Sequence, residues 1–232
     1  MSVPNFQEFA DSAAVAHALA DYVAAALGAR VQRDGLASLA VSGGRTPTRF
    51  FDELSTRDLP WDKILVTLVD ERWVRETSER SNARLVRQHL LTNKAASARF
   101  VALANDAPTP EAGLFAVNEA LEDLPWPLAA AVLGMGDDGH TASFFPGGDH
   151  LEEAIDPDGA LGLLPMHAPA AGEPRITLTL PVLLAADALA LHIEGAAKRP
   201  VLDAALGEGP ATDMPIRAVL RARPALDIFW CP

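Results

Sequence analysis

The chain has 232 residues, of which 49% are hydrophobic and 22% charged, a composition typical of a folded globular protein and unlike that of a disordered one. Its formal net charge of −12 disfavours nucleic acids and anionic membranes as partners, because both attract basic protein surface. Cys231 is the single cysteine, residues 1–11 lack the basic and apolar regions of a signal peptide, and no apolar run approaches the ~18 residues that span a bilayer, so we expect a cytoplasmic protein.

Segments with helical and strand-like patterns alternate along the chain. In chain order the patterns predict helix 11–27, strand 36–41, helix 47–54, strand 64–69, helix 82–91, strand 100–103, helix 110–124 and strand 129–133. After a loop-rich stretch, 146–174, they predict strands 175–180 and 188–193, helix 198–206, and strand 227–230, which we expect to close the sheet. Near-continuous apolar strands alternating with helices predict one α/β domain over residues 1–232, with a doubly wound, mostly parallel sheet and helices on both faces, a Rossmann-like three-layer sandwich.

Each polar cluster that could do chemistry follows one of these predicted strands. The clusters are 42–44, 70–72, 134–140 and 195–198. In doubly wound sheets, ligands bind beyond the carboxyl ends of the strands. The sequence therefore predicts that all four clusters face a single pocket.

The segment 134–140 reads Gly-Met-Gly-Asp-Asp-Gly-His and is the most informative of the four. Its glycine spacing matches the dinucleotide fingerprint, but Asp137 and Asp138 would place two negative charges beside a pyrophosphate, and no strand-end acid follows about 20 residues later. We therefore interpret the glycines as shaping a turn that presents His140, a side chain able to move protons near neutral pH. Asp138 could orient its ring. The remaining histidines are expected to pack or cap: His17, His89, His150, His167 and His192.

Ser42, Gly43 and Gly44 lie between a predicted strand and a predicted helix. Two glycines expose backbone N–H groups at a helix start, which favours an anion, and Arg45 adds a further donor. A plain strand-to-helix turn is the alternative. We favour phosphate or sugar-phosphate binding, although the segment is not a P-loop, because no Gly-Lys-Ser/Thr follows.

Basic residues also follow predicted strands or open an element. Asp70 and Arg72 could hold sugar hydroxyls and a phosphate together, or could form a solvated corner. Lys198 stands at a helix start, where the helix dipole does not favour it, and Arg175 opens a strand after a loop. A bound anion would explain both positions, with ordinary surface solvation as the alternative. An acidic chain can bind a small anion if its basic residues are concentrated at the site.

Taken together, these segments resemble the 6-phosphogluconolactonase family. The matching residues are Ser42-Gly43-Gly44 with Pro47, Asp70-Glu71-Arg72-Trp73-Val74, Ser81-Asn82, residues 134–147 (Gly-Met-Gly-Asp-Asp-Gly-His-Thr-Ala-Ser-Phe-Phe-Pro-Gly), Arg175-Ile176-Thr177-Leu178, and Lys198. The resemblance covers nearly the whole chain in order and spacing. Two departures are Arg75, where the family usually has proline, and Phe144, where it usually has leucine. Neither touches a group that would do chemistry.

The resemblance implies hydrolysis of 6-phospho-D-glucono-1,5-lactone to 6-phospho-D-gluconate, the second step of the oxidative pentose phosphate pathway, with no cofactor and no metal. It implies that His140 is the general base on water, oriented by Asp138 or by Asp70. Arg72, Lys198 and Arg175 would hold the phosphate. The partner is then a small sugar-phosphate lactone, and the protein is a monomer or a small homo-oligomer.

Two other functions are weighed against this one. The glucosamine-6-phosphate deaminase/isomerase group looks similar at Asp-Gly-His, but it carries a glutamate five residues after the histidine, where Phe145 stands here. A catalytically silent sugar-phosphate sensor would keep the phosphate site and lose the base, and the presence of His140 argues against it. A nicotinamide-dependent dehydrogenase is rejected on the charge and spacing of the glycine segment.

Overall fold

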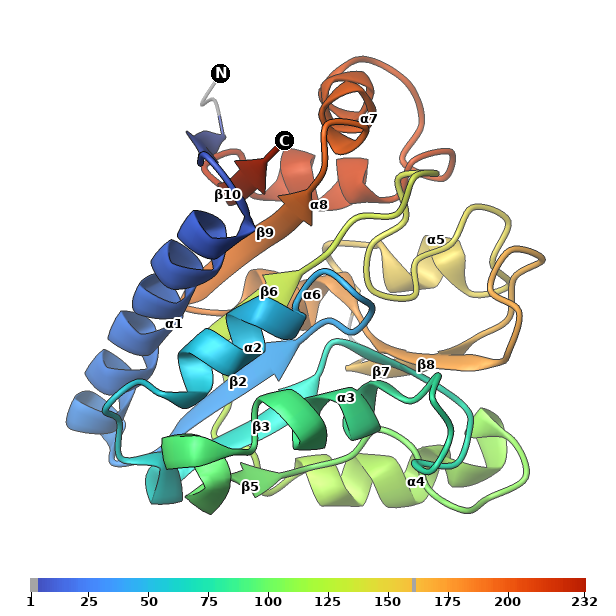
Figure 1. Ribbon diagram of the computed structural model, residues 1–232. Helices are drawn as coiled ribbons and strands as arrows, with labels where there is room; N and C mark the ends of the chain where they lie inside the picture. Colours follow the sequence, from blue (N-terminus) through green and yellow to red (C-terminus); the bar gives the residue numbers. More distant parts are fainter. Residues whose placement is uncertain (1–3, 160–161) are drawn as a thin grey trace.

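The computed structural model describes residues 4–159 and 162–232. At its centre is a parallel sheet with strand order β1-β10-β9-β6-β2-β3-β5 (Figure 1). The strands are β1 (Asn5–Glu8), β2 (Ala37–Val41), β3 (Ile64–Leu68), β5 (Arg99–Phe100), β6 (Ala130–Leu133), β9 (Ala188–Glu194) and β10 (Asp227–Cys231). Every residue of β2, β3 and β6 is buried, which is why these strands read as unbroken apolar runs.

Helices cover both faces of this sheet, as the sequence predicts. They are α1 (Ser12–Asp34), α2 (Thr48–Ser55), α3 (Asn82–His89), α4 (Pro110–Leu121), α5 (Leu151–Ala154), α6 (Leu180–Leu184), α7 (Lys198–Leu206) and α8 (Ile216–Ala222). In Figure 1, α1, α2 and α3 lie in front of the sheet, and α6 and α8 lie behind it. The predicted fold class, a mostly parallel α/β sandwich, is confirmed.

A second, antiparallel sheet with order β4-β8-β7 corrects the prediction in one region. Its strands are β4 (Asp70–Arg72), β7 (Leu163–Met166) and β8 (Arg175–Leu178). Residues 70–72 do follow a strand of the main sheet, as expected, but they form a strand themselves. Residues 146–174 were expected to be a loop and strand 175–180 to belong to the main sheet, and both expectations are wrong. The chain passes from β3 directly into β4, and the backbone N–H of Leu178 donates to the carbonyl of Val69 at 2.9 Å. An apolar or alternating pattern indicates which side chains of a strand are buried. It does not indicate which other strand pairs with it.

The edges of the main sheet and the helix bounds also differ from prediction. β10 does not close the sheet, because β1 pairs with its outer side. β1 is only four residues long and half exposed, so it has no apolar run to signal it. α1 begins after its N-cap Asp11, one residue from the predicted start, and continues to Asp34 rather than ending at 27. The strand predicted at 100–103 is shorter, because β5 pairs with β3 only at Arg99 and Phe100.

α1 is the one described helix with the length and composition of a membrane span, with a mean hydropathy of 1.3 over its most apolar stretch. The prediction that no such run exists is therefore wrong. The helix nevertheless packs along the protein core, with Val15, Leu19, Val23 and Leu27 fully buried. It contacts α2, β2 and β10. One buried face and one exposed face are typical of a helix that covers a sheet.

Candidate active site

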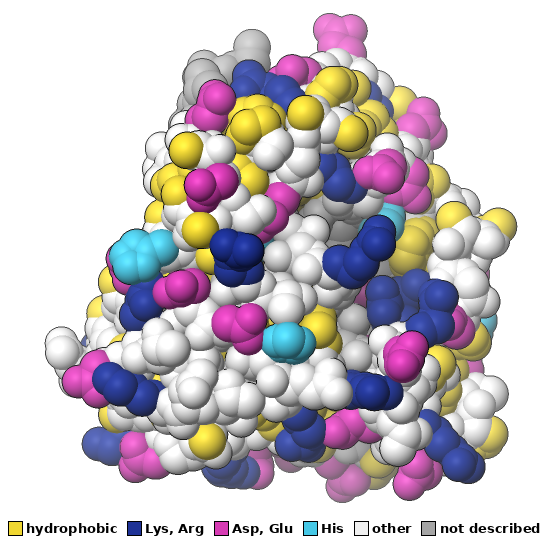
Figure 2. Space-filling view, in the orientation of Figure 1, with side chains coloured by type: hydrophobic (Ala, Val, Ile, Leu, Met, Phe, Trp, Pro, Cys, Tyr) yellow, Lys and Arg dark blue, Asp and Glu magenta, His cyan; other side chains and the backbone are white. Residues whose placement is uncertain are grey.

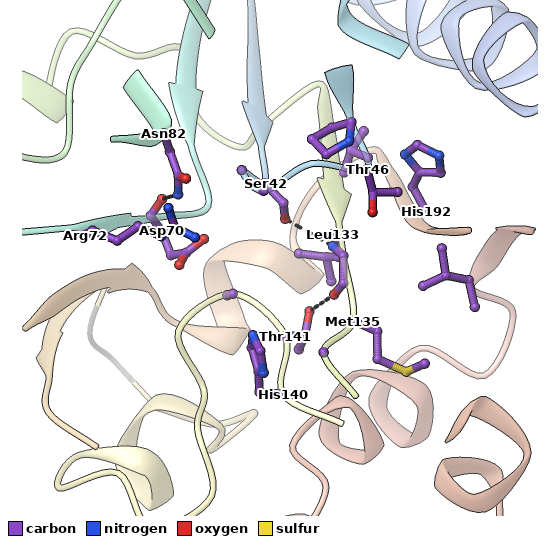
Figure 3. A pocket seen from close by; sticks show the side chains of 18 of the residues that line it. Ser42, Thr46, Asp70, Arg72, Asn82, Leu133, Met135, His140, Thr141 and His192 are labelled. Atoms are coloured by element: carbon purple, nitrogen blue, oxygen red, sulfur yellow. Dashed lines mark hydrogen bonds between the residues drawn. The ribbon is translucent and has the colours of Figure 1, made fainter. Parts of the chain in front are cut away.

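A cavity of about 320 Å³ lies at the carboxyl ends of β2, β3, β6 and β9. Its lining includes eight of the residues singled out in the sequence: Ser42, Gly43, Gly44, Asp70, Arg72, His140, Arg175 and Lys198. Figure 3 shows several of them around the same space, and on this face of the molecule Lys and Arg side chains gather around a hollow (Figure 2). Arg45 is exposed and does not line the cavity. Asp138 does not line it either, but bonds directly to His140.

The turn after β6 contains glycines and is stabilised by hydrogen bonds between two hydroxyl groups and its backbone. Ser42 Oγ accepts a hydrogen bond from the backbone N–H of Gly134 at 3.1 Å, and Thr141 Oγ1 donates to the carbonyl of Gly134 at 2.8 Å (Figure 3). A Cβ atom on Gly136 would lie 2.1 Å from Nδ1 of His140, so no other residue fits beneath the ring. The histidine therefore folds back over the turn that carries it.

His140 and Asp138 form a short hydrogen-bonded pair. The ring Nδ1 lies 2.6 Å from Oδ1 of Asp138, and the same oxygen accepts the backbone N–H of His140 at 3.0 Å. Burial by itself would raise the pKa of Asp138, but the hydrogen bonds and charge of His140 outweigh it and hold that pKa below its ordinary value. An ionised carboxylate on Nδ1 directs the basic lone pair to Nε2, which has no partner among the described residues.

One face of the His140 ring stacks on Phe145, with ring centroids 4.3 Å apart. The guanidinium of Arg175 lies over the same phenyl ring at 5.1 Å. Phe145 thus separates the histidine from the arginine and fixes the orientation of both.

The resemblance offered Asp70 as one of two residues that could orient His140, but Asp70 contacts other side chains. Its Oδ2 accepts a hydrogen bond from Ser143 Oγ at 2.6 Å and lies 3.9 Å from Nη1 of Arg175. Within the described residues it makes no hydrogen bond to His140, whereas Asp138 touches the ring directly. Asp138 is therefore the carboxylate in contact with the His140 ring, and Asp70 is a buried acceptor on the cavity wall.

Two arginines bring unsatisfied donors to the cavity. The Nε atoms of Arg72 and Arg175 are buried and have no hydrogen-bond partner within residues 4–159 and 162–232. Burial lowers the pKa of Arg175, with the attraction of Asp70 opposing this and the repulsion of Arg72 adding to it. Leaving a buried charged donor unpaired is costly, so this wall of the cavity is suited to an anionic ligand.

Glu71, between Asp70 and Arg72, has a structural role that its neighbours do not share. Its carboxylate accepts backbone N–H bonds from Asn82 at 2.8 Å and Ala83 at 2.7 Å, at the start of α3. Burial raises the pKa of Glu71 and these hydrogen bonds oppose the rise. The Asp-Glu-Arg triplet is therefore divided, with its middle residue capping a helix.

Lys198 approaches the cavity from the start of α7. Its Nζ donates to the carbonyl of Met135 at 2.8 Å and to Oδ1 of Asp137 at 2.5 Å. The lysine thus holds the turn after β6 as well as facing the cavity. Asp137 is largely exposed, so an anion in the cavity would compete with it for the ammonium group.

The cavity lining also contains residues that were not proposed as site residues from the sequence, although Asn82 and Thr141 lie within segments that match the family: Thr46, Arg80, Asn82, Thr141, His192 and Glu194. His192 was expected only to pack, yet it is buried at the cavity edge with Nε2 2.9 Å from Oε1 of Glu194. Glu194 ends β9, so the same strand-end rule that selected Asp70 would have found it. Arg80 has no such signal, because it reaches the cavity from the loop between β4 and α3.

Within residues 4–159 and 162–232, no group of three or more His, Cys, Asp or Glu side chains is arranged to hold a metal ion.

Comparison with known proteins gives consistent relatives over the whole chain. The family model described as "Glucosamine-6-phosphate isomerases/6-phosphogluconolactonase" matches residues 10–230. The 6-phosphogluconolactonase of Rhizobium meliloti is 52% identical over 98% of this chain and 99% of its own length, and that of Mesorhizobium japonicum is 51% identical over 98% and 95%. The crystal structure of a 6-phosphogluconolactonase from Shewanella baltica superposes with a TM-score of 0.95 at 39% identity, covering 100% of this chain and 98% of that one.

Proposed function

The chain belongs to the glucosamine-6-phosphate isomerase/6-phosphogluconolactonase family, and on that premise we propose that its cavity hydrolyses 6-phospho-D-glucono-1,5-lactone to 6-phospho-D-gluconate. Lactone hydrolase activity is supported by the 6-phosphogluconolactonases that are 51% and 52% identical to it. The observation that carries the proposed mechanism is the His140–Asp138 pair, because His140 lines the cavity and its Nε2 has no hydrogen-bond partner among the described residues. We place the reaction as the second step of the oxidative pentose phosphate pathway, in the cytoplasm.

His140 is the general base in this mechanism. Its Nε2 takes a proton from a water molecule as the water oxygen attacks the lactone carbonyl carbon. Asp138 stabilises the imidazolium that forms. When the tetrahedral intermediate collapses, the bond from the carbonyl carbon to the ring oxygen breaks, and the imidazolium returns the proton to that oxygen. The products are a carboxylic acid, which ionises at neutral pH, and a free hydroxyl group.

The other charged groups bind the substrate and the developing oxyanion. Arg72 and Arg175 supply Nε–H donors that have no partner among the described residues, and Lys198 supplies an ammonium group at another part of the same cavity. Backbone N–H groups of the turn 42–44 add neutral donors for an anion. Arg45 lies outside the cavity lining, so we leave it out of the binding site.

The deaminase alternative is disfavoured by Phe145. This position would have to hold the glutamate of the deaminase proton relay, and here it holds a phenyl ring stacked on His140 at 4.3 Å. A phenyl ring neither accepts nor donates a proton, so the ring-opening relay is incomplete.

The purified protein is expected to accelerate the decay of 6-phospho-D-glucono-1,5-lactone above its spontaneous rate, measured by the release of acid at constant pH. The same preparation should release no ammonia from glucosamine 6-phosphate. Ammonia release at enzymatic rates would support the deaminase instead. Binding of 6-phosphogluconate without any acceleration of lactone decay would support a sensor and contradict the proposal.

Arg72→Ala is expected to raise KM about tenfold with little change in kcat, because a hydrogen bond from a charged donor contributes about 1.5 kcal/mol or more. The comparison variant is Arg45→Ala, which removes an arginine outside the cavity lining and should leave KM near the wild-type value. Initial rates over a range of lactone concentrations measure both constants. Equal increases in KM for the two variants would remove Arg72 from the proposed binding site.

A further inference from the structure

The turn that carries His140 is supported by residues 198–217, which reach it from α7 and from the segment before α8, and from this support we infer that Arg217 is a positioning residue for His140. The inference rests on the proposed lactonase function. Arg217 does not line the cavity. It acts through the backbone that lies against the turn.

Residues 198–217 hold the turn at two places. At one end, Nζ of Lys198 donates to the carbonyl of Met135 at 2.8 Å. At the other end, the backbone N–H of Ile216 donates to the carbonyl of Gly139 at 2.9 Å. The side chain of Met214 packs so closely on Gly139 that a Cβ there would lie 3.0 Å from it. Gly139 is the neighbour of His140 and of Asp138, so its position sets theirs.

Arg217 holds the connection between these two ends. Its guanidinium is buried and donates to three carbonyl groups, those of Ala204 at 3.0 Å, Glu208 at 2.9 Å and Pro210 at 3.1 Å. Ala204 lies in the last turn of α7, and Glu208 and Pro210 lie in the connection to α8. One side chain therefore ties the end of α7 to the loop that leads into Met214 and Ile216.

The loop is shaped to fit this guanidinium. Gly209 has φ +129°, and a Cβ on it would lie 2.6 Å from Nη1 of Arg217. Only glycine combines that backbone conformation with so close an approach. In Figure 1 the connection between α7 and α8 runs beside the chain that follows β6.

Without the guanidinium, the three carbonyls lose their shared donor. The loop then keeps the bond from Arg221 to the carbonyl of Gly209 at 2.5 Å and two long backbone bonds, from Gly207 to Ala204 at 3.2 Å and from Asp213 to Pro210 at 3.4 Å. Met214 and Ile216 can then shift, and Gly139 shifts with them. A displacement of about 1 Å of a catalytic group can cost roughly 100-fold in rate, so a partial displacement of His140 is expected to cost on the order of tenfold. The lactone would still bind, because Arg72 and Arg175 lie elsewhere on the cavity wall.

Arg223 provides a matched control. Arg217 lies in α8, and Arg223 directly follows that helix. Like Arg217, Arg223 donates to three carbonyl groups, those of Leu184, Ala186 and Asp187 at 3.0, 3.1 and 3.2 Å. These carbonyls precede β9, at the opposite end of that strand from the cavity. Replacing either arginine removes a comparable set of bonds, but of the two only Arg217 bonds to the segment that leads into Met214 and Ile216, which contact the turn.

The test compares Arg217→Met with Arg223→Met in the full chain, measuring Tm, kcat, KM and the pH profile of kcat/KM. Both variants are expected to lower Tm. Arg217→Met alone should lower kcat on the order of tenfold with KM nearly unchanged. It should also shift the pH profile of kcat/KM, which reports the ionisation of the His140–Asp138 pair in the enzyme without substrate. Arg217→Lys, which keeps one charged donor group, should recover part of kcat.

Gly209→Ala serves as the second variant if Arg217→Met fails to fold. It displaces the guanidinium without removing it and should show the same loss of kcat and the same change in pH profile. Wild-type kcat and pH profile in the folded variants would overturn the inference, as would equal losses in Arg223→Met. Failure of the proposed function itself would look different, because the wild-type protein would then not accelerate lactone hydrolysis.

Discussion

His140→Ala is expected to lower kcat for lactone hydrolysis by about 100-fold or more, because general base catalysis contributes roughly this factor. The ring is partly exposed at the cavity, packs on Phe145 and, in the part of the chain that the structure describes, hydrogen-bonds only to Asp138. Its removal should therefore leave the fold intact. Residual activity is expected from the arginines and backbone donors, which still bind the lactone and stabilise the oxyanion.

The control for this variant is its Tm and far-UV circular dichroism, which should match the wild type. His167→Ala is a useful companion, because His167 bonds to Asp149 away from the cavity and should not alter the rate. A near-normal kcat in His140→Ala would show that another group activates the water.

Asp138→Asn is expected to lower kcat by about 100-fold while changing KM little. An asparagine can present its amide N–H to Nδ1 and so favour the tautomer with the proton on Nε2, which cannot act as a base. It also fails to stabilise the imidazolium. The matched control is Asp70→Asn, since Asp70 bonds to Ser143 and not to His140.

NMR of the imidazole ring separates the two aspartates. The signals and titration of His140 should change in Asp138→Asn and stay close to wild type in Asp70→Asn. The opposite pattern would make Asp70 the orienting residue.

The pH dependence of the free energy of unfolding gives a second readout for Asp138. Because the folded protein lowers the pKa of Asp138, the carboxylate adds stability at neutral pH that is lost as pH falls through that lowered pKa. In Asp138→Asn, this part of the decrease in the free energy of unfolding at acidic pH should be absent.

Phe145 shows how a single position separates related chemistries. The ring stacks on His140 and also lies beneath Arg175. In the mechanism that we propose, the histidine acts on a water molecule and returns one proton, and the stacked ring is compatible with both steps. The resemblance to the deaminases would require a proton-transferring carboxyl group at this position, and Phe145 does not supply one.

The shared edge of strands β2, β3, β6 and β9 was determined by the sequence alone. A strand buried on both faces leaves an unbroken apolar run, and the polar residues that follow it must lie at the same edge of a parallel sheet. Ser42, Asp70, His140 and Lys198 are assigned to one place by this rule, and all four line the cavity. The assignment of residues 1–232 to one domain stays a prediction.

Only the tertiary structure decided which neighbours these residues have. Asp138 rather than Asp70 contacts His140, Glu71 caps α3, and 70–72 pairs with β8 in a second sheet. Arg217 reaches carbonyls at 204–210 whose loop lies against the His140 turn. A sequence pattern reports the local periodicity of the backbone and the burial of each side chain. Contacts between loops depend on how all the helices and strands pack together in three dimensions. The spacing of residues within one segment carries no information about that packing.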